Sequence, residues 1–149
     1  MARYFTVDEA ERQLPQVEAA LRDAMFQRDE AKKAQEQLEA ITARIRVAGG
    51  ARVNPGELLR LRSARDLASL GMRGALEKIE RLGAQLKDLD IGLIDFLCHY
   101  EGREVCLCWK MGENGITHWH ATDEGFRGRK PIDSTFLRSH RGDSPSDVN

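Results

Sequence analysis

The chain has 149 residues, of which 32% are charged and 41% are hydrophobic. This length fits one folded domain or one domain with an extension, and the balance of residue types is typical of a folded chain with a large solvated surface. A formal net charge of −1 argues against a protein that mainly binds nucleic acid or an anionic membrane. No segment approaches the roughly 18 apolar residues of a membrane span, and the first residues contain no apolar run of signal-peptide length.

The N-terminal segment has the pattern of a short helix followed by a long one. Thr6 and Glu9 are three residues apart, as in a capping box that begins a helix. Pro15 disfavours a helix interior by about 3 kcal/mol, so we expect the first helix to end or kink near Leu14. From Leu14 onward apolar residues recur at steps of three and four, and this period predicts a helix over residues 15–47.

A second long helix follows a short turn. Gly49-Gly50 supplies a stop signal, and Asn54-Pro55 has the capping residue and first-position proline of a new helix. Residues 1–84 are therefore predicted to form an antiparallel helical hairpin with a short N-terminal helix. Gly71 and Gly74 lie within the second helix, where they allow either close helix contact or a packing notch for a partner. A heptad seam typical of a coiled coil comprises Ala68, Met72, Ala75, Ile79, Leu82 and Leu86.

The sequence after the second helix changes to the alternation of apolar and polar residues that predicts strands. Glu101-Gly102 marks one turn, and Asn114-Gly115 is typical of a two-residue hairpin because both residues tolerate positive φ. We expect three or four short antiparallel strands within a β module over residues 85–132, packed on the hairpin. The polar tail, residues 133–149, is expected to be disordered. Together these elements predict an α+β fold.

Two histidines in the β module have the spacing of a shared metal site. His118 and His120 are two residues apart on a predicted strand, so both imidazoles face the same side. Imidazole binds zinc, nickel, copper and iron, and a carboxylate can complete a two-histidine site. The alternative is that both are ordinary surface or half-buried histidines. The carboxylates that are near in sequence are Asp88, Asp90, Asp95, Asp123 and Glu124.

The three cysteines lie close together in a chain without an export signal, which indicates reduced thiols and a cytoplasmic protein. Cys106 and Cys108 share one face of a predicted strand, with one intervening residue where zinc knuckles usually have two to four. Core packing is the favoured interpretation, with a nucleophilic Cys108 activated by a histidine as the alternative. Trp109 and Trp119 lie on strands predicted to pair, where they form either a core or a wall on which a ligand stacks.

A glycine-rich basic loop follows the predicted strands at residues 125–131. Its backbone can approach an anion, and Arg129 can clamp a carboxylate or phosphate. The alternative is a solvated connector, because the loop has no phosphate-loop pattern and does not open a clear helix. With Arg138 and Arg141 it makes a local basic patch. This patch suits an acidic partner but has few positive charges for binding duplex nucleic acid.

A set of short motifs runs through nearly the whole chain. They are Tyr4-Phe5-Thr6, Glu9-Ala10, Leu14-Pro15, Leu86-Lys87-Asp88-Leu89-Asp90, Gly92-Leu93-Ile94-Asp95-Phe96, Leu107-Cys108-Trp109-Lys110, Gly112-Glu113, Trp119-His120 and Gly125-Phe126-Arg127-Gly128-Arg129. This set resembles the bacterial domain-of-unknown-function family 2203, and the helices between the motifs match it in character. The resemblance supports the α+β architecture and implies no reaction, because that family has no assigned activity.

The resemblance also points to particular positions. The residues that match the motif positions of the family are Glu9, Asp88, Asp90, Asp95, Trp109, His120 and Arg129. The resemblance gives less support to His118, where relatives more often carry an aromatic residue. At Ala121 the family tends to have an acid, and if that acid serves the family as a ligand or base, this chain lacks it.

Two hypotheses for function follow. In the first, the chain binds a divalent transition metal, such as zinc, nickel or iron, at a His/carboxylate site in the β module. Its residues are His120 as the primary metal ligand, Asp95, Asp88, His118 and Glu9 as further ligands, and Trp109 and Arg129 as ligand-binding residues. In the second, the chain is a non-enzymatic scaffold that forms a dimer or tetramer through its helical hairpin. Whether the protein is an enzyme is left open, and neither a membrane nor a nucleic-acid partner is expected.

Overall fold

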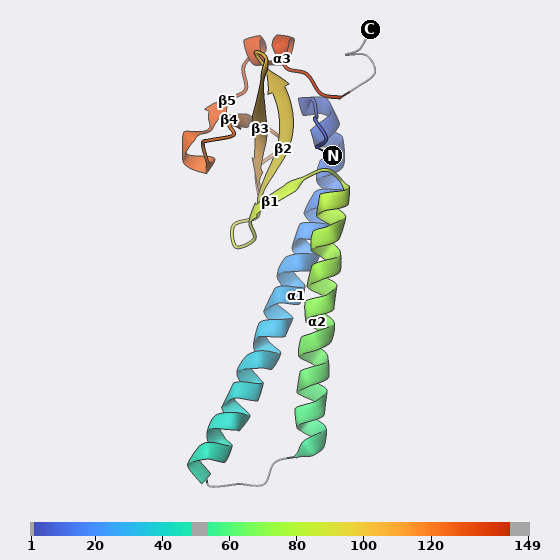
Figure 1. The fold of residues 1–149 in the computed structure, drawn as a ribbon, viewed down its shortest axis with the longest axis vertical. Coiled ribbons are helices and arrows are strands. Elements are labelled where there is room, and N and C mark those ends of the chain that lie inside the picture. Colours follow the sequence, from blue (N-terminus) through green and yellow to red (C-terminus); the bar gives the residue numbers. More distant parts are fainter. Residues whose placement is uncertain (1, 49–53, 144–149) are drawn as a thin grey trace. The chain divides into compact units, whose positions relative to one another are not determined.

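The computed structural model describes residues 2–48 and 54–143. Its elements, drawn in Figure 1, are α1 (Val7–Ala48), α2 (Pro55–Arg81), β1 (Gln85–Asp88), β2 (Leu93–Tyr100), β3 (Arg103–Lys110), β4 (His118–Ala121), the 3-10 helix η1 (Phe126–Gly128), β5 (Lys130–Pro131) and α3 (Ser134–Ser139). This order confirms the predicted α+β class, a helical hairpin followed by an antiparallel sheet. The predicted turn at Gly49-Gly50 lies outside the described residues.

The chain divides into two compact units. The hairpin unit comprises residues 22–76 and contains most of both long helices. The sheet unit comprises residues 1–21 and 77–149, and contains the strands together with the first turns of α1 and the end of α2. None of the described helices has a stretch long and apolar enough to cross a membrane.

A narrow apolar seam between α1 and α2 holds the hairpin unit together. Leu38 and Ile41 of α1 pack with Leu61 of α2, and each is 8% exposed or less. Asn54 caps α2 as the sequence predicts, because its side-chain oxygen accepts the Gly56 N–H at 2.9 Å. The two helices run side by side in Figure 1, which confirms the predicted hairpin.

The first part of α1 differs from the prediction at Pro15. The sequence predicts a break there, but α1 is one continuous helix with the proline inside it. Pro15 is exposed, whereas Ala10 and Val17 on either side of it are both 0% exposed. Burial of the helix before and after the proline offsets the backbone hydrogen bond that the proline cannot make.

The described part of the chain contains five strands, which form one antiparallel sheet in the order β1-β2-β3-β4-β5. The two-residue β5 is an addition to the three or four strands that the sequence predicts. One face of the sheet is apolar: the ring of Phe96 packs on Phe5 with 5.1 Å between centroids, and Leu107 is 0% exposed. The opposite face, here called the polar face, carries Asp95 of β2, Cys106 and Cys108 of β3, and His118 and His120 of β4.

The two predicted turns of the sheet have different outcomes. Glu101-Gly102 joins β2 to β3 with φ values of 54° and 74°, which confirms the tight turn. Asn114-Gly115 instead lies within a longer connection over residues 111–117, and Asn114 is not among the described residues with positive φ. Glu113 stabilises this connection, because its carboxylate accepts the Lys110 N–H at 2.7 Å.

The C-terminal segment is folded where the sequence predicts disorder from residue 133 onward. Asp133 caps α3, because its carboxylate accepts the Phe136 N–H at 2.8 Å. Phe136 is 1% exposed, and its ring centroid lies 4.4 Å from that of Tyr100 and 5.2 Å from that of Trp119. One buried aromatic ring thus anchors a segment whose composition is polar. Residues 144–149 lie outside the described part of the chain.

Candidate metal centre

The pairing of β2, β3 and β4 fixes which side chains are neighbours on the polar face. Asp95 is directly opposite Cys108, which is in turn opposite His118, and Cys106 is directly opposite His120. Opposed residues in an antiparallel pair have Cβ atoms about 4.5–5.5 Å apart. The sheet therefore gathers a carboxylate, two thiols and two imidazoles from three strands on one surface.

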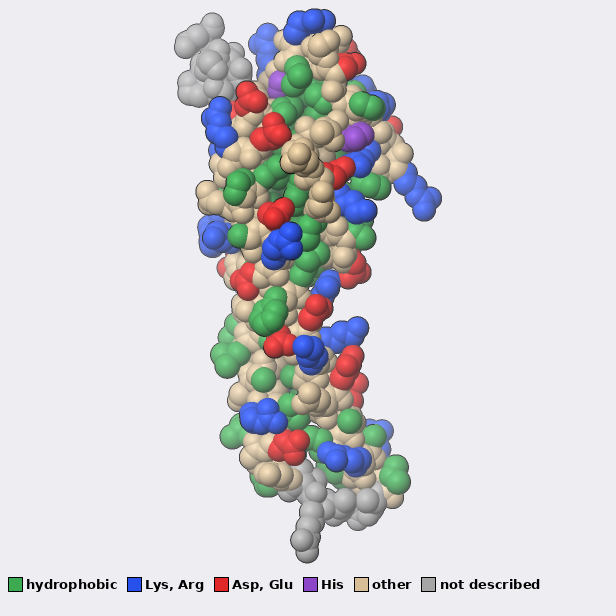
Figure 2. All heavy atoms as spheres, turned by 180° about the vertical axis from the view of Figure 1, so that it is seen from behind, with side chains coloured by type: hydrophobic (Ala, Val, Ile, Leu, Met, Phe, Trp, Pro, Cys, Tyr) green, Lys and Arg blue, Asp and Glu red, His purple; other side chains and the backbone are tan. Residues whose placement is uncertain are grey.

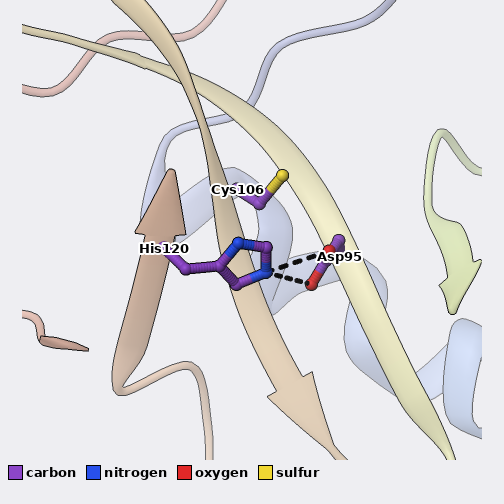
Figure 3. Close-up of side chains that lie close together, drawn as sticks. All are labelled: Asp95, Cys106 and His120. Atoms are coloured by element: carbon purple, nitrogen blue, oxygen red, sulfur yellow. Dashed lines mark hydrogen bonds and ion pairs between the residues drawn. The ribbon is translucent and has the colours of Figure 1, made fainter. Parts of the chain in front are cut away.

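Asp95, Cys106 and His120 form a compact cluster on this face (Figure 3). One ligand atom from each, a carboxylate oxygen, a thiol sulfur and a ring nitrogen, lies within 4.8 Å of the other two. His120 Nε2 is 3.2 Å from Asp95 Oδ1 and 3.1 Å from Oδ2. The three residues are 2%, 4% and 4% exposed. Because buried charges need a partner, these groups require either a proton or a metal ion between them.

The hydrogen bonds of His120 decide which of its ring nitrogens is available. Nδ1 lies 2.7 Å from the carbonyl oxygen of Ala121, and a carbonyl only accepts, so Nδ1 carries a proton. Nε2 then faces Asp95 either as a second N–H or with its lone pair. A ring N–H held by a backbone carbonyl is the arrangement that orients metal-ligating histidines.

Without a metal, a proton holds the cluster together. Hydrogen bonds to Asp95 and Cys108 raise the pKa of His120 from 6.5 to about 10, although burial opposes the rise. At neutral pH the imidazolium and the Asp95 carboxylate therefore form a buried ion pair. Burial raises the pKa of Cys106 to about 12, so its thiol keeps its proton until a metal ion displaces it.

Arg129 lies in the loop between β4 and β5, where it is bound to a carboxylate of the connection before β4. Its guanidinium donates to both carboxylate oxygens of Glu113, at 3.0 and 2.6 Å. The same group lies 4.2 Å from the ring centroid of Phe126. Although burial opposes it, the hydrogen bond from Arg129 holds the pKa of Glu113 below its usual value. The charge of Arg129 is thus already matched by a carboxylate in this loop.

The structure brings two of the predicted metal ligands, His120 and Asp95, into the cluster and leaves the others outside it. His118 lies on the polar face but is half-buried, with its Nδ1 2.8 Å from a neighbouring threonine hydroxyl. Asp88 is exposed, and its carboxylate accepts the Asp90 N–H at 2.9 Å. Both are therefore engaged in local hydrogen bonds away from the cluster.

The remaining predicted site residues have structural contacts. Glu9 forms the capping box, because its carboxylate accepts the Thr6 N–H at 2.9 Å and its own N–H donates to the Thr6 hydroxyl at 3.2 Å. Trp109 is 1% exposed, and its indole N–H donates to the Glu113 carbonyl at 3.2 Å. Trp109 is therefore a core residue rather than a wall on which a ligand stacks. Arg129 clamps a carboxylate, but that carboxylate belongs to the chain itself.

Cys106 is the member of the cluster for which the sequence favours core packing. The spacing of residues within β3 does not distinguish a core thiol from a ligand. The signal is in the strand pairing, which sets Cys106 directly opposite His120. That signal is present only once the register between β3 and β4 is known.

Comparison with known proteins identifies the family. A family model described as an uncharacterized conserved protein, DUF2203, matches residues 3–132 of the 149-residue chain. No curated protein and no solved structure shows a significant similarity to the chain. The matched range contains all five strands of the described sheet and the whole Asp95–Cys106–His120 cluster. The chain therefore belongs to the DUF2203 family of uncharacterised conserved proteins.

Proposed function

We propose that this protein binds one divalent transition metal ion through Asp95, Cys106 and His120. The observation that carries the proposal is a buried carboxylate, thiol and imidazole whose ligand atoms lie within 4.8 Å of one another. Ordinary surface histidines, the alternative left open by the sequence, do not describe His120, which is 4% exposed and paired with a buried carboxylate.

The separation of the ligand atoms supports a tetrahedral metal site. Zinc lies about 2.0–2.1 Å from nitrogen and oxygen ligands, which places two such ligands about 3.3 Å apart at a tetrahedral angle. His120 Nε2 and the Asp95 carboxylate oxygens are separated by 3.1 and 3.2 Å. A metal ion can therefore take the place of the shared proton with little movement of either side chain.

The ligand types favour a transition metal over magnesium or calcium. Imidazole and thiolate bind zinc, nickel and iron, whereas magnesium and calcium prefer sites built from oxygen ligands. The hydrogen bond from His120 Nδ1 to the Ala121 carbonyl orients the ring and makes Nε2 a stronger donor to a metal. The proposed ion is therefore zinc, nickel or iron.

The burial of the cluster supports a metal that stabilises the sheet rather than one that holds a substrate. Structural zinc sites are closed, whereas catalytic sites keep one position open for water or substrate. The three side chains are at most 4% exposed, and they come from β2, β3 and β4. A metal bound there links the three central strands of the sheet, so we propose a structural role for it.

Elemental mass spectrometry on protein purified without an affinity tag tests the proposal. The unaltered protein is expected to carry about one equivalent of metal, and His120→Ala is expected to carry almost none because a ligand is lost. His118→Ala is the matched control, since His118 lies on the same strand and face but outside the cluster. Metal retained in His120→Ala, or a metal-free and fully folded unaltered protein, contradicts the proposal.

A second candidate function, self-association, is favoured by exposed leucines in the hairpin unit. Leu59, Leu67 and Leu70 of α2 are 66%, 69% and 57% exposed, and their spacing places them within one stripe of the helix. Figure 2 shows hydrophobic side chains at the surface of the helices. Gly71 is not a notch for a partner, because a Cβ there would lie 2.8 Å from the Gln27 side chain. An uncovered apolar stripe supports a dimer or tetramer formed through the hairpin.

Analytical ultracentrifugation at micromolar concentration tests self-association. Leu67→Glu places a charge in the apolar stripe and is expected to convert a dimer or tetramer into a monomer. Leu137→Glu is the control, because Leu137 is 50% exposed on α3 in the sheet unit. A monomeric unaltered protein contradicts this second candidate.

A further inference from the structure

We propose that Cys108 is the fourth metal ligand, so that the ion is zinc in a closed site of two thiolates, one imidazole and one carboxylate. This inference rests on the proposed function and extends it by naming the metal and the residue that completes its shell. Cys108 is 0% exposed and belongs to the polar face, next to the three ligands already identified.

The strand register places Cys108 beside the other ligands. It is directly opposite Asp95 in the β2–β3 pair, and it lies two residues from Cys106 on the same side of β3. Cys98, the third cysteine, lies on the apolar face, where its sulfur is 3.6 Å from the carbonyl oxygen of Arg141. The register therefore separates two cysteines that can reach one ion from a third that cannot.

The Cys108 thiol needs one rotation to join the cluster. It is outside the group of three mutual neighbours, so it must turn about its Cα–Cβ bond to join them.

The ligand set of two thiolates, one imidazole and one carboxylate selects zinc among the three candidate metals. Zinc is usually four-coordinate and tetrahedral in closed sites with sulfur and nitrogen ligands. Nickel more often takes square-planar or tetragonal geometries with nitrogen and oxygen, which this set does not provide. Iron bound by cysteines is typically part of a cluster with inorganic sulfide, for which four thiolates are the usual ligands.

Cobalt(II) added to metal-free protein counts the thiolate ligands, because each cobalt–sulfur bond contributes charge-transfer absorption in the near ultraviolet. Cys108→Ser is expected to lose about half of that absorption. It is also expected to bind zinc more than about 100-fold more weakly, which is a larger loss than the removal of a residue outside the ligand shell causes. Cys98→Ser is the matched control, since Cys98 is an equally buried thiol on the opposite face, and it is expected to change neither quantity. Full absorption in Cys108→Ser overturns the inference.

X-ray absorption at the zinc edge of the unaltered protein gives the same count without any substitution. The expected shell has two sulfur atoms at about 2.3 Å and two nitrogen or oxygen atoms at about 2.0 Å. A shell with one sulfur atom overturns the role of Cys108 and leaves the proposed function standing. Failure of the unaltered protein to bind either zinc or cobalt overturns both.

Discussion

The hairpin unit and the sheet unit are stabilised in different ways. The hairpin unit has a thin core around Leu38 and Leu61, and it leaves leucines such as Leu67 in solvent. The sheet unit instead buries an ion pair, Asp95 and His120, inside paired strands. The repeat of apolar residues along each helix is enough to specify the first unit. The second depends in addition on which residues of distant strands lie opposite one another.

The largest expected effect comes from breaking the buried pair of the sheet unit. In the metal-free protein, His120→Ala leaves the Asp95 carboxylate buried without a partner, and we expect it to lower the free energy of unfolding by about 3–5 kcal/mol. Urea denaturation followed by circular dichroism measures the change. In the double variant His120→Ala/Asp95→Ala the unpaired charge is gone, so part of the stability is expected to return. A double variant less stable than His120→Ala contradicts the ion-pair account.

A smaller effect is expected in the core of the hairpin unit. Leu38→Ala removes a side chain that is 8% exposed at the helix–helix seam, and the expected loss in the free energy of unfolding is about 2 kcal/mol. Val47→Ala is the control, since Val47 is 89% exposed and its truncation is expected to change stability by less than about 0.5 kcal/mol. Equal losses for the two variants, measured by denaturation, are inconsistent with the seam described here.

The pH dependence of stability separates the two units further. In the metal-free protein the pKa of His120 is raised from 6.5 to about 10, so its contribution is fully present below about pH 6.5 and is lost as the pH rises through about 10. We expect the free energy of unfolding to fall by more than about 1 kcal/mol across that range, the equivalent of one pKa unit. His120→Gln cannot titrate, and its stability is expected to lack this decline. If stability falls with pH equally in the unaltered protein and in His120→Gln, the decline comes from groups other than His120.

The smallest effect is expected at the C-terminal helix. Asp133→Ala removes the N-cap of α3 and is expected to lower stability by about 1 kcal/mol, because the Phe136 N–H loses its acceptor. Hydrogen exchange of the α3 amides measures the loss locally. Thr135→Ala serves as the control, because Thr135 is exposed and lies between Asp133 and Phe136 without taking part in the cap hydrogen bond. Unchanged exchange in Asp133→Ala shows that Phe136 alone holds the helix.

The sequence is sufficient to predict the hairpin because its information is local. Steps of three and four between apolar residues identify the helices, and Asn54 marks the start of α2. The break expected at Pro15 is absent. Helix propensity describes only the local cost of the proline, and it does not account for the burial of Ala10 and Val17 on either side. Phe136 is a second case in which local sequence is not enough. The composition of the C-terminal segment is polar, but burial of this one ring orders it.

The candidate site is only half predictable because it depends on strand register. A two-residue turn at Asn114-Gly115 would pair Glu113 with Ile116 and so set His120 opposite Trp109. The observed connection sets His120 opposite Cys106. A shift of three residues is odd, and an odd shift moves every side chain of a strand to the other face. His120 and Asp95 are identifiable as reactive residue types, but their thiol neighbour is not.

The most direct test of a metal-centred sheet unit is the thermal unfolding of metal-free protein as zinc is added up to and beyond one equivalent. Binding to the folded state at 100 times the dissociation constant adds about 2.7 kcal/mol of stability. For a chain of this size that corresponds to a rise in the melting temperature of about 5–10 °C, and we expect it to saturate at one equivalent. A melting temperature that does not respond to zinc, in a protein that unfolds cooperatively, contradicts the account and leaves the Asp95–His120 proton as the link between the strands.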